Sequence, residues 1–205
     1  PHQKILERHG LPDATERYEQ AAAARAVFLE EGYMTVGMDH FALPDDPLAV
    51  AAKEGRLHRN FQGYTTDQAQ AVVGFGLSAI SRVPEAYAQN TSSLKCYREA
   101  LEQDRLPVEK GRAVVREDRL RADIIERLMC YFTVDAGEIC RLHSFPPGFV
   151  DESLQKVRQM EKNGLVETDG RTVTVTDKGR HFVRSVCVCF DAYFQDSEKK
   201  YARAI

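Results

Sequence analysis

The residues best suited to metal chemistry are the five cysteines, and their spacing argues against a metal site. They are Cys96, Cys130, Cys140, Cys187 and Cys189. A zinc site is normally built from close pairs of thiolates, and an iron–sulfur cluster needs three or four that converge. Only Cys187 and Cys189 are close, and on a helix their side chains would point about 200° apart. We therefore interpret the cysteines as small apolar core residues and expect no metal ligand.

Histidine and arginine offer a second kind of chemistry, which is proton transfer or the binding of anions. No two histidines stand three or four residues apart on a predicted helix, so no histidine metal motif is visible. His40 follows Asp39 at a predicted strand end, where a structural hydrogen bond is the simpler interpretation. His58 and Arg59 lie in a long loop, where the arginine fork could hold a carboxylate. A solvated loop explains this pair equally well.

Glycines are the third group of residues that could take part in a binding site. Gly74 and Gly76 precede a predicted strand instead of following one and opening a helix, so they do not form a dinucleotide fingerprint. They let the backbone approach something bulky, or they form a tight turn.

The elements that must position these residues begin with a helix over 13–31. Asp13 and Glu16 have the spacing of a capping box, and a glycine ends the helical pattern. A β-rich run over 33–38 follows, so that helix, glycine turn and strand make half of an α/β repeat. Residues 39–42 then lie at the edge where α/β folds bind ligands.

The next segment, 43–76, is irregular, with a short helix predicted over 47–54. A strand is predicted over 77–83, and a helix capped by Thr91 or Ser92 follows it.

Beyond residue 111 the pattern predicts three helices, a hairpin and a closing helix. The three helices are expected over 116–132, over 135–143 and from a cap at Asp151 to residue 163. The hairpin is expected to turn at Asp169-Gly170. The last helix is predicted from the four-residue spacing of Phe182, Val186, Phe190 and Phe194. This is the order of a winged-helix domain, which we place at about 112–195.

Charge argues against a nucleic-acid role for that domain. The net charge of the chain is −3, and the third helix balances three acidic against three basic residues. Contacts to phosphate need net positive charge on the contacting face. We therefore expect no nucleic-acid partner, and a DNA-binding or interaction module stays a weaker alternative.

Composition is that of a globular protein: of 205 residues, 43% are hydrophobic and 29% charged. We expect no membrane span, because no apolar run approaches the required ~20 residues. An odd number of cysteines without a signal peptide favours a cytoplasmic location. The chain begins Pro1-His2 without methionine, so we interpret it as a piece of a longer protein.

Four stretches resemble the oxygen-independent coproporphyrinogen III oxidases. They are GMDHFA (37–42), LHRNFQGYTT (57–66), GFGLSAIS (74–81) and YAQN (87–90), and residues 176–180 and 187–191 are also similar to that family. The family's related haem-chaperone branch differs at the first two stretches, so a haem-binding paralogue ranks second.

The resemblance implies a radical S-adenosylmethionine enzyme. Its parent would oxidatively decarboxylate two propionates of coproporphyrinogen III to give protoporphyrinogen IX. A [4Fe–4S] cluster and S-adenosylmethionine would supply a 5′-deoxyadenosyl radical that takes a hydrogen from the propionate side chain. The family's Cys-x3-Cys-x2-Cys run, which holds the cluster, is absent here. The resemblance therefore implies the C-terminal portion only, which needs the N-terminal radical domain and is inactive alone.

The resemblance also suggests binding residues, but no catalytic residue. Gln62 and Ile80 stand at positions that in the family lie near a second S-adenosylmethionine. Without the motif, Ile80 would be taken for a core residue. His58, Arg59 and Arg82 are weaker candidates for steering the propionates of the substrate.

The expected fold is α+β and mostly helical. Residues 1–111 would be the end of an open (β/α) barrel with connecting loops and a helix, and residues 112–205 a winged-helix-like C-terminal domain.

Overall fold

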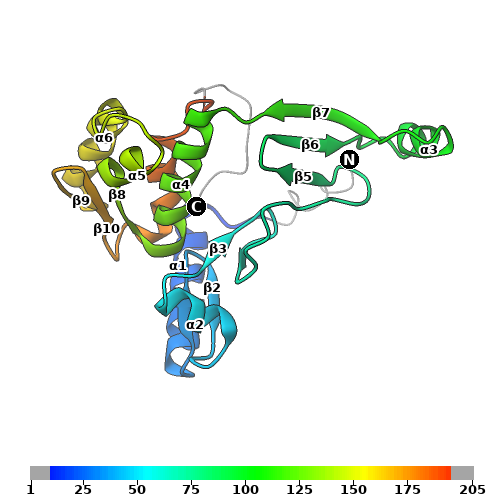
Figure 1. Cartoon of the computed structure of the whole chain (residues 1–205). Coiled ribbons are helices and arrows are strands. Elements are labelled where there is room, and N and C mark those ends of the chain that lie inside the picture. The colour runs from blue at the N-terminus through cyan, green and yellow to red at the C-terminus, as the bar shows by residue number, and fades with distance from the viewer. Residues whose placement is uncertain (1–9, 195–205) are drawn as a thin grey trace.

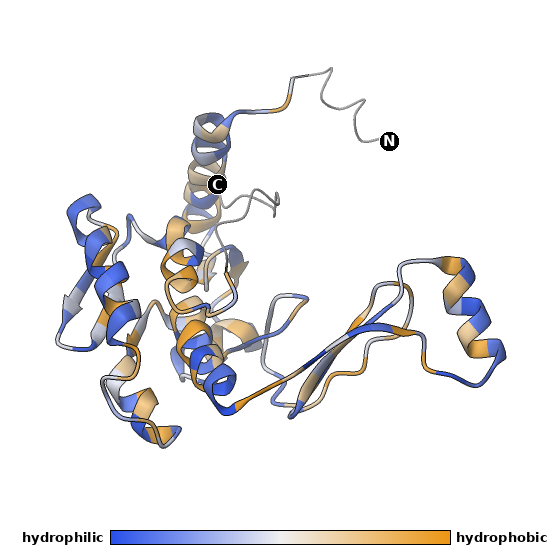
Figure 2. Ribbon diagram, turned by 90° about the horizontal axis from the view of Figure 1, so that it is seen from above, coloured by the Kyte–Doolittle hydropathy of each residue, from blue (hydrophilic) through white to orange (hydrophobic). Residues whose placement is uncertain are grey.

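The computed structural model describes residues 10–194, which form two lobes and a projecting arm. One lobe holds the N-terminal elements, at the bottom of Figure 1, and the other holds the C-terminal elements, at the left. The arm extends to the right and ends in a helix, and Figure 2 shows the same extension from above. The outermost parts of the predicted ranges, 1–9 and 195–205, lie outside the described residues.

The first helix, α1 (Ala14–Glu30), has the predicted capping box. The Asp13 carboxylate accepts a hydrogen bond from the backbone N–H of Glu16 at 2.9 Å, and the Glu16 carboxylate accepts one from the N–H of Asp13 at 2.8 Å. No residue of α1 is buried by the rest of the described chain.

The predicted helix, glycine turn and strand are present, but within the described residues the strand has no parallel neighbour. Strand β1 (Met34–Val36) pairs with β2 (His40–Ala42), and the pairing is antiparallel. Gly37 adopts φ +57°, which permits the tight reversal between them. A parallel repeat needs a neighbouring strand reached by a crossover, and the described residues contain none. Residues 39–42 thus form the turn and returning strand of a hairpin.

The rest of the N-terminal lobe is small. The predicted short helix is confirmed as α2 (Pro47–Lys53), which Asp46 caps, and β3 (His58–Arg59) pairs with β4 (Tyr64–Thr65). The buried core of this lobe consists of Val36, Ala42, Ala49, Leu57 and Tyr64, together with Cys130 from the C-terminal half.

The arm is a three-stranded antiparallel sheet in the order β5-β6-β7. Its strands are β5 (Ile80–Val83), β6 (Ala86–Asn90) and β7 (Val108–Ala113), and α3 (Leu94–Glu102) sits at the tip. The predicted strand therefore begins at residue 80, not 77. The predicted caps of α3 are wrong by one or two residues, because Ser93 receives the capping hydrogen bond from the Cys96 N–H.

The C-terminal lobe contains the predicted helices and hairpin in the predicted order, together with a short strand, β8, that the sequence pattern did not predict. They are α4 (Arg116–Tyr131), β8 (Thr133–Asp135), α5 (Ala136–Leu142), α6 (Asp151–Arg158) with η2 (Gln159–Asn163), β9 (Val166–Asp169), β10 (Thr172–Val175), η3 (Arg180–Phe182) and α7 (Val183–Val188). The sheet order is β8-β10-β9, and the β9–β10 hairpin turns after Asp169 as expected.

The core of this lobe follows the predicted apolar stripe of α4. Leu120, Ile124 and Leu128 are fully buried there, against Val173 of β10 and Phe190. Burial of such side chains is the main term that stabilises the lobe.

Two details of the C-terminal prediction are wrong. Asp151 does not cap α6; its carboxylate instead accepts two hydrogen bonds from Arg171, both at 2.8 Å. The closing helix is shorter than its spacing suggested, because α7 ends at Val188 and Phe194 is 47% exposed. Among the described residues, no helix has the length and apolar character needed to cross a membrane.

Candidate functional site

The first two motif stretches pack directly against each other through Tyr64. Its hydroxyl accepts a hydrogen bond from the Met38 N–H and donates one to the Met129 carbonyl, both at 2.9 Å. A side chain at Gly37 would overlap the Tyr64 ring, so glycine is required there. Burial raises the pKa of Tyr64, which keeps the hydroxyl protonated as a donor.

His40 has a structural role next to this tyrosine. Its Nδ1 lies 2.9 Å from the Asp39 carboxylate, and its ring meets Tyr64 edge-on with centroids 4.9 Å apart. A side chain at Gly63 would come within 3.0 Å of His40 Nε2. The simpler interpretation of His40, a local hydrogen bond, therefore accounts for it.

The other two motif stretches are joined by Asn90 at the end of β6 that lies nearest α3. Its side-chain amide donates to the carbonyls of Gly74 at 3.2 Å and Gly76 at 3.0 Å. A Cβ at Gly74 would lie 2.7 Å from the Ile80 carbonyl. Gly74 thus serves close backbone packing, while Gly76, which has open space around it, adopts φ +105°, a conformation that glycine tolerates in turns.

Ile80 lines a shallow hollow of about 310 Å³ on one face of the arm sheet. Phe61 and Tyr87 line it too, and their rings meet edge-on with centroids 5.8 Å apart. Ile80 is half-buried and directly opposite Gln89 on β6. An aliphatic and two aromatic side chains here make a surface that a flat ring could cover.

Gln62 does not line this hollow. Its side chain is exposed, and its backbone N–H donates to the Asn60 side chain at 2.8 Å. The structure therefore places Ile80 beside Phe61, which precedes Gln62 in the chain, and not beside Gln62 itself.

The three candidate propionate-binding residues meet in a second hollow, of about 210 Å³. His58, Arg59 and Arg82 all line it, together with Glu126 of α4. The Glu126 carboxylate accepts a hydrogen bond from the Arg59 N–H at 3.0 Å and lies 3.3 Å from His58 Nδ1. Arg59 Nε is buried and has no hydrogen-bond partner among the described residues, so this guanidinium keeps a donor to offer.

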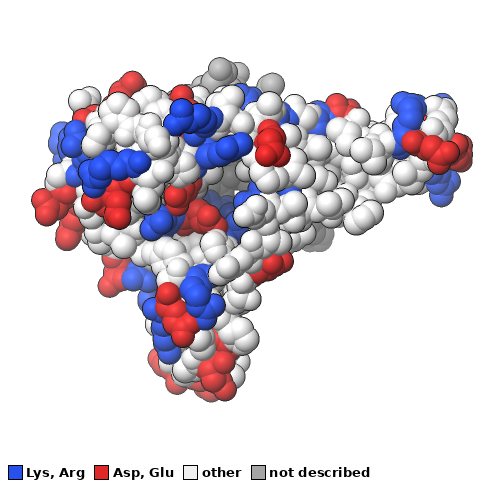
Figure 3. Space-filling model, viewed as in Figure 1, with Lys and Arg blue, Asp and Glu red and all other residues white. Residues whose placement is uncertain are grey.

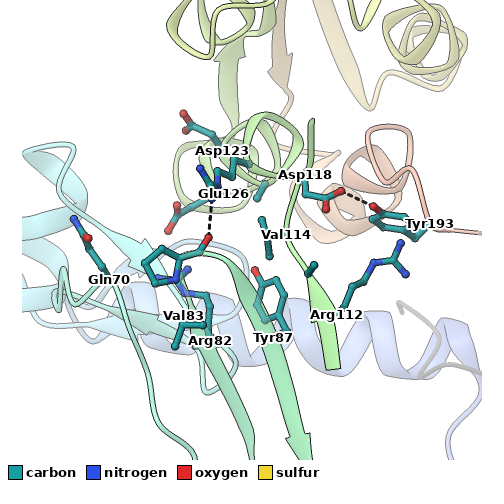
Figure 4. A pocket seen from close by; sticks show the side chains of 14 residues that line it. Gln70, Arg82, Val83, Tyr87, Arg112, Val114, Asp118, Asp123, Glu126 and Tyr193 are labelled. Carbon is teal, nitrogen blue, oxygen red and sulfur yellow. Dashed lines mark hydrogen bonds between the residues drawn. The ribbon is translucent and has the colours of Figure 1, made fainter. Parts of the chain in front are cut away.

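A larger hollow of about 520 Å³ lies between α4 and the arm sheet (Figure 4). The Tyr193 hydroxyl donates to the Asp118 carboxylate at 2.6 Å, and the Arg112 guanidinium stacks 3.5 Å from the centre of the Tyr193 ring. Burial alone would raise the pKa of Asp118. The hydrogen bonds from Tyr193 and the Val115 N–H, with the charges of Arg112 and Arg121, outweigh burial and lower it.

The three hollows share residues and so form one band across the molecule. Arg82 and Glu126 line both the second and the large hollow, while Tyr87 and Arg112 line both the large hollow and that of Ile80. Figure 3 shows basic side chains beside the recess between the arm and the rest of the molecule. Basic, acidic and apolar side chains all line this band, so the arrangement suits a ligand that is extended, partly apolar and charged.

The cysteines behave as core or partly buried residues, except for Cys96, which is exposed. Burial raises the pKa of Cys130 and of Cys187 to about 12 each, so both stay thiols. Within residues 10–194 no group of three or more His, Cys, Asp or Glu side chains is placed to hold a metal ion.

Sequence reasoning missed Phe61, Tyr87, Arg112 and Glu126. Period-two alternation in the arm strands would have placed Tyr87 on the face of Ile80 and Arg82, so a local signal existed for it. Glu126 carries no such signal, because its partners His58 and Arg59 lie 68 and 67 residues away.

Comparison with known proteins gives matches along the whole chain. An oxygen-independent coproporphyrinogen III oxidase of Bradyrhizobium diazoefficiens is 42% identical over 204 residues, covering 100% of this chain and 45% of that protein. One of Synechocystis is 39% identical over 212 residues, covering 100% of this chain and 46% of that protein. No family model matches the chain.

A solved structure is also similar. It is coproporphyrinogen III oxidase from Escherichia coli, described as a radical SAM enzyme, with a TM-score of 0.83 and 39% identity. The match covers 90% of this chain and 43% of that one. The resemblance seen in the motifs and the α+β fold are therefore confirmed. The chain spans about 45% of the length of the curated relatives it matches.

Proposed function

We propose that this chain is the C-terminal part of an oxygen-independent coproporphyrinogen III oxidase. The parent would oxidatively decarboxylate two propionates of coproporphyrinogen III to give protoporphyrinogen IX in haem biosynthesis. The observation that carries the proposal is the sequence identity of 42%, over the entire chain, to a relative with that name.

In this proposal the N-terminal lobe is the end of an open (β/α) barrel. Its missing neighbours would come from the N-terminal radical SAM domain of the same polypeptide. Support comes from α1, none of whose side chains is buried, and from Val27, Phe28 and Leu29, which stay exposed near its end. Apolar side chains left in water on a helix favour a partner surface. The C-terminal lobe would be a winged-helix-like support, with the domain boundary between residues 111 and 112.

The described residues do not fit the proposed iron–sulfur cluster. Cys187 and Cys189 are the closest pair in sequence, but each thiol is directed to a backbone carbonyl, that of Ile125 and that of Ser185. The cluster ligands must therefore come from elsewhere in the parent, and the role of this chain lies in binding cofactor and substrate.

The residues of the arm do fit S-adenosylmethionine. Ile80, Phe61 and Tyr87 can cover an adenine ring, and Gln62 on the adjoining loop can bond a polar edge of the same molecule. This molecule would be the second S-adenosylmethionine implied by the resemblance, while the molecule that supplies the radical would be held at the cluster in the rest of the parent. The role of Ile80 and Gln62 is to bind and orient the second molecule.

The hollow around Arg59 would receive a propionate. His58, Arg59 and Arg82 converge there, and the buried Nε of Arg59 has no described partner. Glu126 holds the loop by its backbone and so positions Arg59. A bound carboxylate would complete the hydrogen bonding of the guanidinium.

The test is turnover by the full-length parent, prepared without oxygen and with its cluster reconstituted. We expect conversion of coproporphyrinogen III that requires S-adenosylmethionine and a reductant. We expect the 205-residue chain alone to give no turnover and no iron–sulfur absorbance. A parent that binds haem but never converts coproporphyrinogen would overturn the proposal in favour of a haem-binding paralogue. We further propose a cytoplasmic location, because buried thiols persist in reducing compartments.

A further inference from the structure

The strand register places three basic residues on one face of the arm sheet. Tyr87 is paired with Arg82 on one side and with Arg112 on the other, so these three side chains share a face. Gln89 is likewise paired with Ile80 and Lys110. Because successive strand residues alternate between faces, both rows lie on the same face. We call this face, made of Ile80, Arg82, Tyr87, Gln89, Lys110 and Arg112, the basic row.

The opposite face differs in character. Between the basic-row residues stand Ser81, Ala88 and Gly111, with Ala86 and Ala113 at the end. The basic side chains of the sheet are therefore concentrated on a single face, which lines the hollows around Ile80 and beside α4, while Val83 and Glu109 stand on the opposite face. The basic row carries three cations and no carboxylate of its own.

The cations of the basic row lack ionic partners within residues 10–194. None of the ion pairs found there includes Arg82, Lys110 or Arg112; those nearest in sequence involve Lys95 and Arg121. Arg112 presents a face of its guanidinium to the Tyr193 ring, which leaves its in-plane N–H groups free to donate. Arg82 makes one long contact, 3.5 Å to the Ala69 carbonyl.

The acidic groups around the band already have hydrogen-bond donors. Asp118 accepts from Tyr193 and from the Val115 N–H, and Glu126 accepts from the Arg59 N–H. Asp123, at the same hollow, accepts from Arg127 and lies 3.1 Å from His143 Nε2. These contacts supply the acids on the side of α4 with hydrogen-bond donors other than the cations of the sheet, and of those cations Arg112 also acts on Asp118 through its charge.

We propose that the basic row binds carboxylates of the tetrapyrrole substrate, with Lys110 and Arg112 as binding residues beyond those near Arg59. Arg82 and Arg112 are separated by one strand, so their backbones lie about 10 Å apart. Tyr87 stands between them and presents a ring to the pyrroles. The basic row would hold propionates that the reaction leaves intact, while the hollow around Arg59 would receive a different propionate of the same substrate molecule. This inference rests on the proposed function and adds residues to its substrate site.

Charge decides between two sources of a carboxylate. S-adenosylmethionine, proposed above to lie over Ile80, has a single carboxylate, which can pair with only one of the three basic residues; its sulfonium and ammonium groups cannot pair with the other two. Coproporphyrinogen has four carboxylates and no cationic group. The row therefore favours the tetrapyrrole, and the test must separate the two ligands.

The decisive variant is Lys110→Gln in the full-length parent. The Lys110 side chain is exposed and makes no hydrogen bond or ion pair among the described residues, so its replacement leaves the backbone pairing with Gln89 intact. We expect the KM for coproporphyrinogen to rise about tenfold, the effect of one charge-assisted hydrogen bond. The KM for S-adenosylmethionine should not change. Lys110→Arg should restore the affinity, and Arg98→Gln, on the exposed side of α3, is the matched control.

A binding measurement gives a readout apart from turnover. The full-length protein is titrated with coproporphyrin III, which is stable in air, and with its tetramethyl ester, which lacks the carboxylates. Lys110→Gln should weaken binding of the acid about tenfold and leave binding of the ester unchanged.

The possible outcomes separate this inference from the proposed function. A parent that converts coproporphyrinogen but is indifferent to Lys110→Gln overturns the basic row alone. A change confined to the KM for S-adenosylmethionine overturns it as well, in favour of the cofactor. A parent that binds coproporphyrin through Lys110 but never converts it overturns the proposed activity and supports the row.

Discussion

At the scale of single residues, Tyr64 joins the two lobes through its side chain. Its hydroxyl bridges the Met38 N–H of the first hairpin and the Met129 carbonyl of α4. The ring needs space that only Gly37 leaves open. Leaving buried hydrogen-bonding groups without a partner costs about 1–3 kcal/mol each, so replacing this tyrosine would lower the free energy of unfolding.

Gly37→Ala tests this close packing. The new Cβ must displace the buried Tyr64 ring and must also adopt φ +57°, so we expect a loss of about 3 kcal/mol in the free energy of unfolding. The matched control is Gly55→Ala, where φ is +71° but nothing lies within 4 Å of the added Cβ. There we expect a loss of about 1 kcal/mol, from backbone strain alone.

Denaturant unfolding of the two variants measures the difference. Equal losses at both glycines would show that the ring moves aside freely, which would contradict the packing argument.

Asp118 gives the molecule a pH dependence that can be assigned to one residue. Its pKa in the folded protein lies below the ordinary value of 3.8. A carboxyl group of this kind contributes stability that is fully present above its unfolded pKa and is lost as the pH falls through its folded pKa. We therefore expect Asp118→Asn to lower stability at neutral pH and to flatten the decline of stability between about pH 5 and pH 2.

Tyr193→Phe removes the hydrogen bond that lowers the pKa of Asp118. Its carboxyl should then titrate closer to the ordinary value, and NMR titration of the Asp118 side chain would record the shift. Asp45→Asn is the control, since Asp45 is exposed and outside the hollows. An unchanged Asp118 titration in Tyr193→Phe would mean that the hydrogen bond does not act on the charge.

At the scale of elements, the arm depends on one buried amide. Asn90, at the end of β6, is 8% exposed, and its amide ties the loop at Gly74 and Gly76 to the sheet. Further hydrogen bonds, from the Gly74 N–H to Ser81 and from the Gly76 N–H to Tyr97, run from the same loop to β5 and α3. The arm is therefore held by hydrogen bonds more than by a hydrophobic core.

Asn90→Asp should loosen the loop over 74–79 without unfolding the lobes. The substitution replaces a double donor with oxygens that face two carbonyls, at a local cost of about 2–3 kcal/mol. Hydrogen exchange should show lost protection at the N–H groups of Gly74 and Ser78 and none at those of α4. Asn163→Asp, at the exposed end of η2, is the control. If the N–H groups of Gly74 and Ser78 stay protected in Asn90→Asp, the Asn90 side chain does not hold this loop to the sheet.

At the scale of the whole molecule, α4 belongs to both lobes. Its buried stripe faces the C-terminal core, while Cys130 and Tyr131 at its end join the core of the N-terminal lobe. The Tyr131 hydroxyl donates to the Leu57 carbonyl at 2.8 Å. The boundary between residues 111 and 112, which stays a prediction, thus assigns to one domain a helix that the other also uses.

Truncation at that boundary should have unequal results. Residues 112–205 contain the entire larger core, so we expect them to unfold in one cooperative transition. Residues 1–111 lose Cys130, Tyr131 and the partner of Tyr64, so we expect no cooperative transition from them. Extending the N-terminal piece to residue 132 should restore it. Calorimetry of the three pieces is the measurement, and a cooperative 1–111 piece would contradict the shared role of α4.

The sequence alone determined those features whose causes are local. The capping box predicts α1, the four-residue spacing predicts the buried stripe of α4, and Asp169-Gly170 predicts the β9–β10 turn. Motifs of a few residues also led to the family. Each of these signals lies within one element, where propensity and spacing are sufficient.

Only the tertiary structure decided which distant groups meet. The overlap of Tyr64 with Gly37 and the bond from Arg59 to Glu126 join positions far apart in the chain. The basic row is likewise set by the register of three strands, because a shift of one residue would turn its cations to the other face. Such contacts depend on chain closure and packing, which no local pattern encodes.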